Sequence, residues 1–206
     1  MEYMIIRAAD PRLLRQAAAL HHDTLSDRSF ITALGERFLL RLYEGLLERD
    51  LGFLVVARDG ERLRGFILAC TDSGRLLSVV ARAPIAFAAS IIPALVRRPW
   101  SVGRLVETAL YGRRERSRVA AELLVIAVDA EVRSIGIGRR LLTELRRELA
   151  ARGISTYRVT VHEAMADANR FYAANGLRLS TTFRLYGVRS NLYVDEFDPA
   201  VAGERS

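Results

Sequence analysis

The junction between an apolar run and a glycine loop constrains the fold of this chain more than any other feature of the sequence. The run VAAELLVIAV (119–128) has the composition of a strand that is buried on both faces. The loop sequence EVRSIGIGRR (131–140) follows, and an amphipathic helical pattern then continues to a stop at Gly153. A strand, a short glycine loop and a helix in direct succession indicate an α/β fold.

The chemistry of this loop suits an anionic ligand. The first turn of a helix has backbone N–H groups without partners, and the helix dipole adds positive charge there. Gly136 and Gly138 would let a phosphate approach the backbone, and Arg133, Arg139 and Arg140 would surround it with charge. The third glycine of a dinucleotide fingerprint and the Gly-Lys-Ser/Thr ending of a P-loop are both missing. Taken alone, the two glycines therefore either cradle a phosphate or only turn the chain.

The remaining pattern completes one domain, which we place at residues 1–198 with a tail at 199–206. Near the N-terminus it predicts a short strand and a helix from Pro11 to about His22. A second helix is expected from about Ile31 to Glu48, followed by a hairpin that turns at Asp59-Gly60. A helical insertion is expected at 80–118. Past Gly153, the pattern predicts a strand at 155–162, a helix at 165–176 and two closing strands.

The charge of the chain is concentrated in that insertion. The net charge is +7, every basic residue is arginine, and residues 80–118 hold eight arginines and two acids. The single cysteine, Cys70, excludes an intramolecular disulfide framework, and we expect no metal centre. The apolar run PIAFAASIIPALV (84–96) is shorter than the ~20 residues that a spanning helix needs. With no signal peptide visible, we expect a cytoplasmic protein.

Two spaced motifs resemble the GCN5-related N-acetyltransferase (GNAT) family. RSIGIG (133–138) is similar to the family's Arg/Gln-x-x-Gly-x-Gly/Ala signature, and ANRFYAANGL (168–177) is similar to its second motif, an aromatic pair followed by a turn with glycine. The resemblance implies a mixed, mostly antiparallel sheet with one splayed parallel pair, helices on both faces, and a helical insertion before the cofactor-binding strand. It also implies an acetyl-CoA-dependent acyltransferase.

The resemblance assigns the donor site to the strand, the loop and the second motif. The pyrophosphate of the coenzyme would lie on the loop, and the pantetheine arm would run between the strand at 119–128 and the strand at 155–162, as an added strand would. The implied coenzyme A contacts are Ile126, Ala127, Val128, Arg133, Ser134, Ile135, Gly136, Ile137, Gly138, Arg139, Asn169 and Tyr172.

The catalytic residues that we expect are Tyr172, Glu122 and His21. Tyr172 matches the family tyrosine whose hydroxyl can donate a proton to the leaving thiolate, although it could also be a core aromatic. A base would accept the proton of the amine; Glu122 and His21 are our candidates, with His22 and His162 as further ones. Asn169 either contacts the coenzyme or only caps a helix.

The function that we expect from the sequence is transfer of an acetyl group to a primary amine of a small molecule, with an amino sugar, free or nucleotide-linked, as the leading acceptor. A protein N-terminal or side-chain acetyltransferase and a non-catalytic acyl-CoA-binding module at a membrane are the alternatives. The insertion is a solvated basic surface, a lid that binds an anionic substrate, or an interfacial membrane contact through Arg97, Arg98 and Trp100. A nucleic-acid partner is not expected, because the aromatic residues are not interleaved with the charge.

Overall fold

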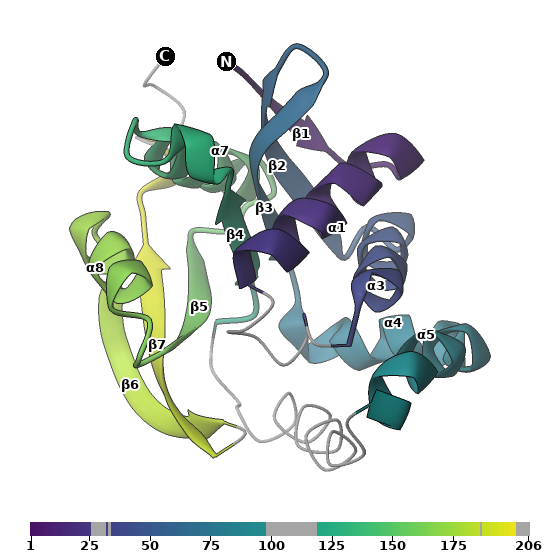
Figure 1. Ribbon diagram of the computed structural model, residues 1–206. Helices are drawn as coiled ribbons and strands as arrows, with labels where there is room; N and C mark the ends of the chain where they lie inside the picture. Colours follow the sequence, from purple (N-terminus) through teal and green to yellow (C-terminus); the bar gives the residue numbers. More distant parts are fainter. Residues whose placement is uncertain (26–31, 33, 98–118, 186, 201–206) are drawn as a thin grey trace.

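A computed structural model describes all residues except 26–31, 33, 98–118, 186 and 201–206. In the described residues, seven strands form one sheet in the order β1-β2-β3-β4-β5-β7-β6. Every neighbouring pair is antiparallel except β4 and β5, which run parallel. The mixed sheet with one parallel pair and helices on both faces confirms the expected fold class (Figure 1). The strands are β1 (Glu2–Ile6), β2 (Gly52–Asp59), β3 (Arg62–Cys70), β4 (Glu122–Val128), β5 (Thr156–His162), β6 (Arg178–Leu185) and β7 (Val188–Glu196).

The helices begin and end close to the expected positions, with two differences. The second helix was expected from about Ile31, which lies outside the described residues; α3 begins at Glu36, after Gly35 with a φ of 97°. The insertion is helical where it is described, but its first helix already starts at Leu76. Residues 98–118, which include Trp100 and most of the insertion's arginines, lie outside the described part of the chain. The helices are α1 (Pro11–Leu25), α3 (Glu36–Glu48), α4 (Leu76–Arg82), α5 (Pro84–Arg97), α7 (Ile137–Ala151) and α8 (Ala166–Ala174), with short 3-10 turns η1 (Ser73–Arg75) and η2 (Ala130–Val132).

Each face of the sheet has its own hydrophobic core. On one face α1 and α3 pack against β2, β3 and β4, and Leu14, Tyr43 and Phe66 are fully buried between them. On the other face α7 and α8 cover the sheet, with Leu141 and Tyr172 in the core. Burying large side chains on both faces is the main source of stability for such a layered fold.

A bulge in β4 changes which side chains reach which core. Leu68 of β3 pairs with Val125 and Ala69 pairs with Leu123, so Leu124 is an extra residue opposite β3. Without a bulge, alternate residues of a strand point to one face. Here Leu123 packs in the core under α7, whereas Val125 packs in the core under α1 and α3. The strand was expected to be buried on both faces; its residues instead alternate between buried and half-buried.

The sheet opens between β4 and β5. Among the described residues these two strands share a single register pair, Glu122 with Arg158, close to the start of each strand. The Arg158 N–H donates to the carbonyl of Ala121 over 3.0 Å, and no further residue of β4 has a register partner on β5 within the described chain. The pair therefore diverges toward the carboxyl ends of both strands, which is the splay that the family resemblance implied.

The helix α7 joins the two halves of this opened sheet. It packs on β2, β3 and β4 through its apolar face. From its polar side, Arg146 donates to Asp195 of β7 over 2.7 Å and to the carbonyl of Asn175, beyond α8, over 2.8 Å. At the other edge Glu148 accepts from Arg7, which follows β1, over 2.6 Å. The position of α7 across the splay is thus fixed from both sides.

Candidate active site

The loop between β4 and α7 is shaped by two residues with positive φ. Asp129 begins it, and its carboxylate accepts the N–H of Glu131 over 3.1 Å. Ser134 has a φ of 66° and Gly136 a φ of 93°, immediately before the first residue of α7. Residues with a Cβ rarely adopt the left-handed conformation, so Gly136 is required by the backbone itself.

Gly138 is needed for a different reason. A Cβ at this position would come within 3.1 Å of the Phe171 ring, which belongs to α8. Such a distance is tighter than ordinary van der Waals contact, so any larger residue would push α8 away from α7. The two glycines therefore serve the fold independently of any ligand: one makes the turn and the other lets the two helices meet.

The same loop leaves the start of α7 available to an anion. Gly136 is the N-cap and has no side chain to accept the first N–H groups of the helix. The loop residues Ser134, Ile135 and Gly136 are exposed. The Arg133 side chain folds back, its Nε donating to the Val128 carbonyl over 3.1 Å, while Arg139 is exposed in the first turn. Backbone donors, the helix dipole and arginine charge thus coincide at one place, which is what a pyrophosphate would require.

An arginine of β3 pairs with the acidic groups near the loop. Arg64 donates to Asp129 over 2.8 Å and to Glu131 over 2.7 Å. These hydrogen bonds are the main reason that the pKa values of both carboxyl groups lie below their ordinary values. The acids are therefore charged but paired, so the positive potential of the helix end is preserved.

The expected cofactor residues of β4 occupy two different environments. Ala127 is buried on the side of α1 and α3, whereas Ile126 and Val128 are half-buried on the side of α7. Their backbone faces the splay, since within the described residues β5 pairs with β4 only at Glu122. Of the loop residues, Ile137 is itself a core residue, 4% exposed, so only its backbone N–H can contribute to a ligand site.

Tyr172 lies on the face of α8 that is turned to the sheet. Its ring packs against Phe171 at 5.3 Å and against Tyr193 at 6.0 Å between ring centres. Burial raises the pKa of its hydroxyl above the ordinary value, so the group is protonated at neutral pH. No hydrogen bond joins this hydroxyl to another described residue. A buried, protonated hydroxyl of this kind can act as a proton donor.

Comparison with known proteins decides the family. The sequence profile of the acetyltransferase (GNAT) family matches residues 18–177. The chain belongs to the GNAT family. No curated protein matches the sequence significantly.

Solved structures share the GNAT fold at low sequence identity. An N-acetyltransferase from Staphylococcus aureus Mu50 is 17% identical, with a TM-score of 0.60 over 93% of this chain and 99% of that one. The PaiA N-acetyltransferase of Thermoplasma acidophilum, solved with coenzyme A, is 16% identical, with a TM-score of 0.57 over 96% and 100%. Ard1 of Thermoplasma volcanium is 13% identical, with a TM-score of 0.58 over 96% and 99%.

Asn169, an expected coenzyme contact of this GNAT chain, is engaged inside the protein. Its side-chain N–H group donates to the carbonyls of His162 over 3.0 Å and Met165 over 2.8 Å. Its side-chain oxygen accepts from Asn191 over 2.8 Å and from Tyr193 over 3.1 Å. Asn169 is not the helix cap either, because α8 begins after Met165 with no side-chain cap. It braces α8 against β5 and β7, and this geometry does not support the coenzyme contact.

Glu122, a candidate base, is in an ion pair at the apex of the splay. Arg158 Nε donates to its carboxylate over 3.1 Å, and the side chains of Arg158 and Glu122 are 4% and 13% exposed. Arg158 also donates to the Ser73 hydroxyl over 3.1 Å. In the structure, the ion pair of Glu122 with Arg158 joins β4 and β5 at the narrow end of the splay. That Glu122 also accepts a proton during turnover stays a prediction.

His21 lies in the core, and this position does not support the expectation that it is the base. Its Nδ1 is 2.6 Å from the Tyr43 hydroxyl and its Nε2 is 2.9 Å from the Thr32 hydroxyl, so both ring nitrogens have partners within the protein. The residue is 5% exposed, and burial lowers its pKa to about 4. The two histidines are adjacent in the sequence, which does not show which of them points into the core. His22 is exposed, 3.8 Å from Asp23, and His162 ends β5 opposite Ser190; for both, the base role stays a prediction.

Sequence reasoning missed two buried hydroxyls on one face of β5 and β7. Thr160 and His162 alternate with the apolar Val159 and Val161, and residues directly opposite in an antiparallel pair share a face. The period-two alternation in TYRVTVH was the available signal. On this face, which is turned away from α7 and α8, the hydroxyls of Thr160 and Ser190 are buried without a hydrogen-bond partner in the described structure.

An open cavity of about 640 Å³ lies next to the loop, on the side of α1. The α1 helix, the β2–β3 hairpin and the loop after β4 form its walls, and Arg133 is at its edge. Many of the charged residues that line it are paired with one another, Arg12 with Glu61 and Arg62 with Asp129. Tyr172 does not line it, so this cavity lies beside the loop and not at the expected proton donor.

Removing one partner of the Glu122–Arg158 pair leaves the other charge buried. We expect Arg158→Met to lower the free energy of unfolding by about 3 kcal/mol. The double variant Glu122→Leu/Arg158→Met is expected to recover most of this loss, because no buried charge remains. Urea denaturation measures both. Arg189→Met is the matched control: its ion pair with Glu163 is exposed, so its loss is expected to stay below about 1 kcal/mol. Strictly additive losses in the double variant would contradict a coupled pair.

Burial of His21 predicts a dependence of stability on acidity. The fold lowers the pKa of His21 from 6.5 to about 4, so in this window the unfolded chain binds a proton that the folded chain does not. The free energy of unfolding is therefore expected to fall as the pH decreases from 6.5 toward 4, with a slope of up to about 1.4 kcal/mol per pH unit. His21→Gln, which cannot titrate, should show a shallower slope than the protein with His21. Equal slopes would mean that His21 is charged in the fold.

Proposed function

We propose that this GNAT chain transfers the acetyl group of acetyl-CoA to the primary amine of a small, hydroxyl-rich acceptor, with an amino sugar as the first candidate. Acetyl-CoA-dependent acyl transfer follows from the family. The observation that carries the finer proposal is the pair of buried, unpartnered hydroxyls of Thr160 and Ser190 on the face of the sheet opposite the donor helices.

The donor half of the site supports the proposal because its shape and charge suit coenzyme A. A diphosphate would accept hydrogen bonds from the first N–H groups of α7, and Arg139 and Arg133 would add charge. The pantetheine arm would bind backbone groups of β4 in the splay, where β5 does not pair with them. The exposed loop at Ile135 leaves the start of the helix open to solvent, so nothing in the described chain has to move for the pyrophosphate to bind.

In the transfer step, the amine nitrogen attacks the thioester carbonyl, the bond between carbon and sulfur breaks, and the sulfur takes a proton. Tyr172 is the residue that we assign to donate this proton, since its hydroxyl is protonated and has no competing partner among the described residues. The proton lost by the amine goes to water or to His162, which ends β5 at the wide part of the splay.

The acceptor half is argued from unsatisfied hydrogen bonding. A buried hydroxyl without a partner costs about 1–3 kcal/mol, which most folded proteins avoid. Ser190 is 0% exposed, and Thr160 lies diagonally across from it on the neighbouring strand. Once the groups that cover these hydroxyls move aside, an acceptor that carries hydroxyl groups of its own could satisfy both, whereas an apolar amine would leave them unpaired. This favours a polar small molecule.

Tyr172→Phe tests the role of the hydroxyl without removing the ring. We expect kcat to fall about tenfold or more, the range of general acid catalysis, with the affinity for coenzyme A unchanged. Thiol release measures kcat and calorimetry measures binding. Tyr193→Phe, on the neighbouring ring, is the matched control and should change kcat much less. An unchanged kcat for Tyr172→Phe would contradict the assignment of Tyr172 as the proton donor.

A panel of amines separates the candidate acceptors. The panel would hold amino sugars, their nucleotide-linked forms, peptides with a free N-terminus, and apolar amines. Turnover with the sugars supports the proposal, and loss of kcat/KM in Thr160→Val/Ser190→Ala would tie it to the two hydroxyls. Turnover with peptides alone would replace it by a protein N-terminal acetyltransferase. Tight coenzyme binding without turnover on any amine would replace it by a non-catalytic binding module.

A further inference from the structure

The outer surface of α5 is apolar and exposed. Ile85, Ile92 and Val96 are 84%, 56% and 78% exposed, respectively. With the exposed Ala88 and Ala89, they recur at the three- and four-residue spacing that forms a single helical face. Large aliphatic side chains with most of their surface in water are ordinary when single, but a continuous stripe of them marks an interaction site.

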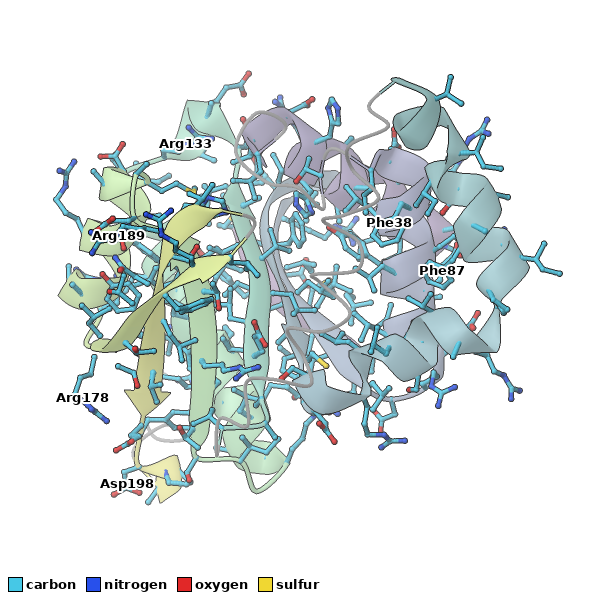
Figure 2. The ribbon with its side chains drawn as sticks, turned by 90° about the horizontal axis from the view of Figure 1, so that it is seen from below. Phe38, Phe87, Arg133, Arg178, Arg189 and Asp198 are labelled. Carbon is cyan, nitrogen blue, oxygen red and sulfur yellow. The ribbon has the colours of Figure 1, made fainter. Side chains whose placement is uncertain are left out.

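The packing of α5 fixes this stripe on the outside. Phe87, on the opposite side of the helix, is 4% exposed and meets Phe38 of α3 edge to face, with 5.8 Å between the ring centres (Figure 2). Ser90 is also on the buried side, its hydroxyl donating to the Phe87 carbonyl over 2.7 Å. The helix therefore cannot rotate its aliphatic face inward without losing the aromatic contact.

The preceding helix extends the apolar surface around a corner. In the described residues no single helix is long and apolar enough to cross a bilayer. Residues Ser73–Arg82 and Pro84–Ile92, which meet at 90°, satisfy length and composition only as a bent pair. Leu77 is 37% exposed on the first arm of this corner, and Ala81 and Ala83 are exposed at the bend. A bent apolar corner at the edge of the molecule has the shape to lie along a surface (Figure 1).

The charged residues in this stretch of the sequence have one sign. From residue 73 to residue 106 the sequence has five arginines and no Asp or Glu. Arg75 and Arg82, on the first arm, are exposed. An apolar helical face next to basic residues is the combination that binds the interface of an anionic bilayer. A second copy of the chain would fit this corner poorly, because a two-fold contact would bring the same arginines together.

We propose that the α4–α5 corner anchors the protein to an anionic lipid surface as an interfacial contact. The aliphatic face of α5 enters the boundary between headgroups and acyl chains, and Arg75 and Arg82 contact the phosphates. In Figure 1 the corner is at the lower right and α7 is at the upper left, so a bilayer bound at the corner would lie away from α7. The proposal is independent of the acceptor proposed above, because it uses none of the residues of the donor or acceptor sites.

Vesicle co-sedimentation tests the anchor. The full chain is expected to bind vesicles of phosphatidylglycerol with phosphatidylcholine at least about tenfold more tightly than vesicles of phosphatidylcholine alone. Ile85→Ser/Ile92→Ser/Val96→Ser should lose this binding by about tenfold or more, with coenzyme A affinity and melting temperature unchanged. Arg75→Gln/Arg82→Gln should reduce the preference for anionic lipid while retaining part of the binding.

Leu179→Ser is the matched control, since Leu179 is an exposed leucine on β6, away from the corner, and its 50% exposure is similar to that of Ile92. It should bind vesicles as the unaltered chain does. Vesicle binding that the triple variant retains would overturn the proposal. The proposal would also be overturned if the unaltered chain did not bind vesicles but formed dimers, and if the triple variant were monomeric. That result would assign the corner to contact with a second copy of the chain.

Discussion

The parallel pair β4–β5 meets at one residue pair, and the rest of the architecture follows from that opening. A sheet that is split between these strands loses backbone hydrogen bonds through its middle, so other contacts must hold its two halves together. The α7 helix does this, with its apolar face on β2–β4 and with Arg146 bonded to Asp195 of β7. At the narrow end, Glu122 and Arg158 close the gap with a largely buried ion pair. The splay remains open at the wide end, where the donor would bind, and the helix that bridges it presents its N-terminus there.

The glycine loop shows how a structural requirement and a binding site can coincide. Gly136 is required by its φ of 93° and Gly138 by the Phe171 ring that lies against it. Both needs exist without a ligand, yet they produce an uncapped helix end surrounded by arginines. The contact between Gly138 and Phe171 also sets the distance between α7 and α8, and α8 carries Tyr172. The loop thus positions the proposed proton donor as well as the proposed pyrophosphate site.

Local patterns predicted the fold well, whereas the roles of polar side chains depended on contacts that a sequence does not display. The hairpin at Asp59-Gly60 and the helix after the glycine loop were expected from these patterns, and the splayed pair was expected from the family resemblance. The β4 bulge was not, because one extra residue in a run of apolar residues leaves no compositional trace. His21 and Asn169 were assigned to catalysis and cofactor binding, but Tyr43, Thr32 and Tyr193 engage them. These partners come from other elements, and only the packing of the helices on the sheet brings them within reach.

The central claim is that the start of α7 holds the pyrophosphate of an acyl-CoA, and calorimetry with two ligands tests it most directly. Coenzyme A carries the pyrophosphate and pantetheine does not. Gly136→Val forces a β-branched residue into the left-handed region, which distorts the loop at a cost of about 1–3 kcal/mol. We predict that this variant, still folded by its melting curve, binds coenzyme A at least about tenfold more weakly and binds pantetheine as the unaltered chain does. Equal affinity of the two proteins for coenzyme A would contradict the claim.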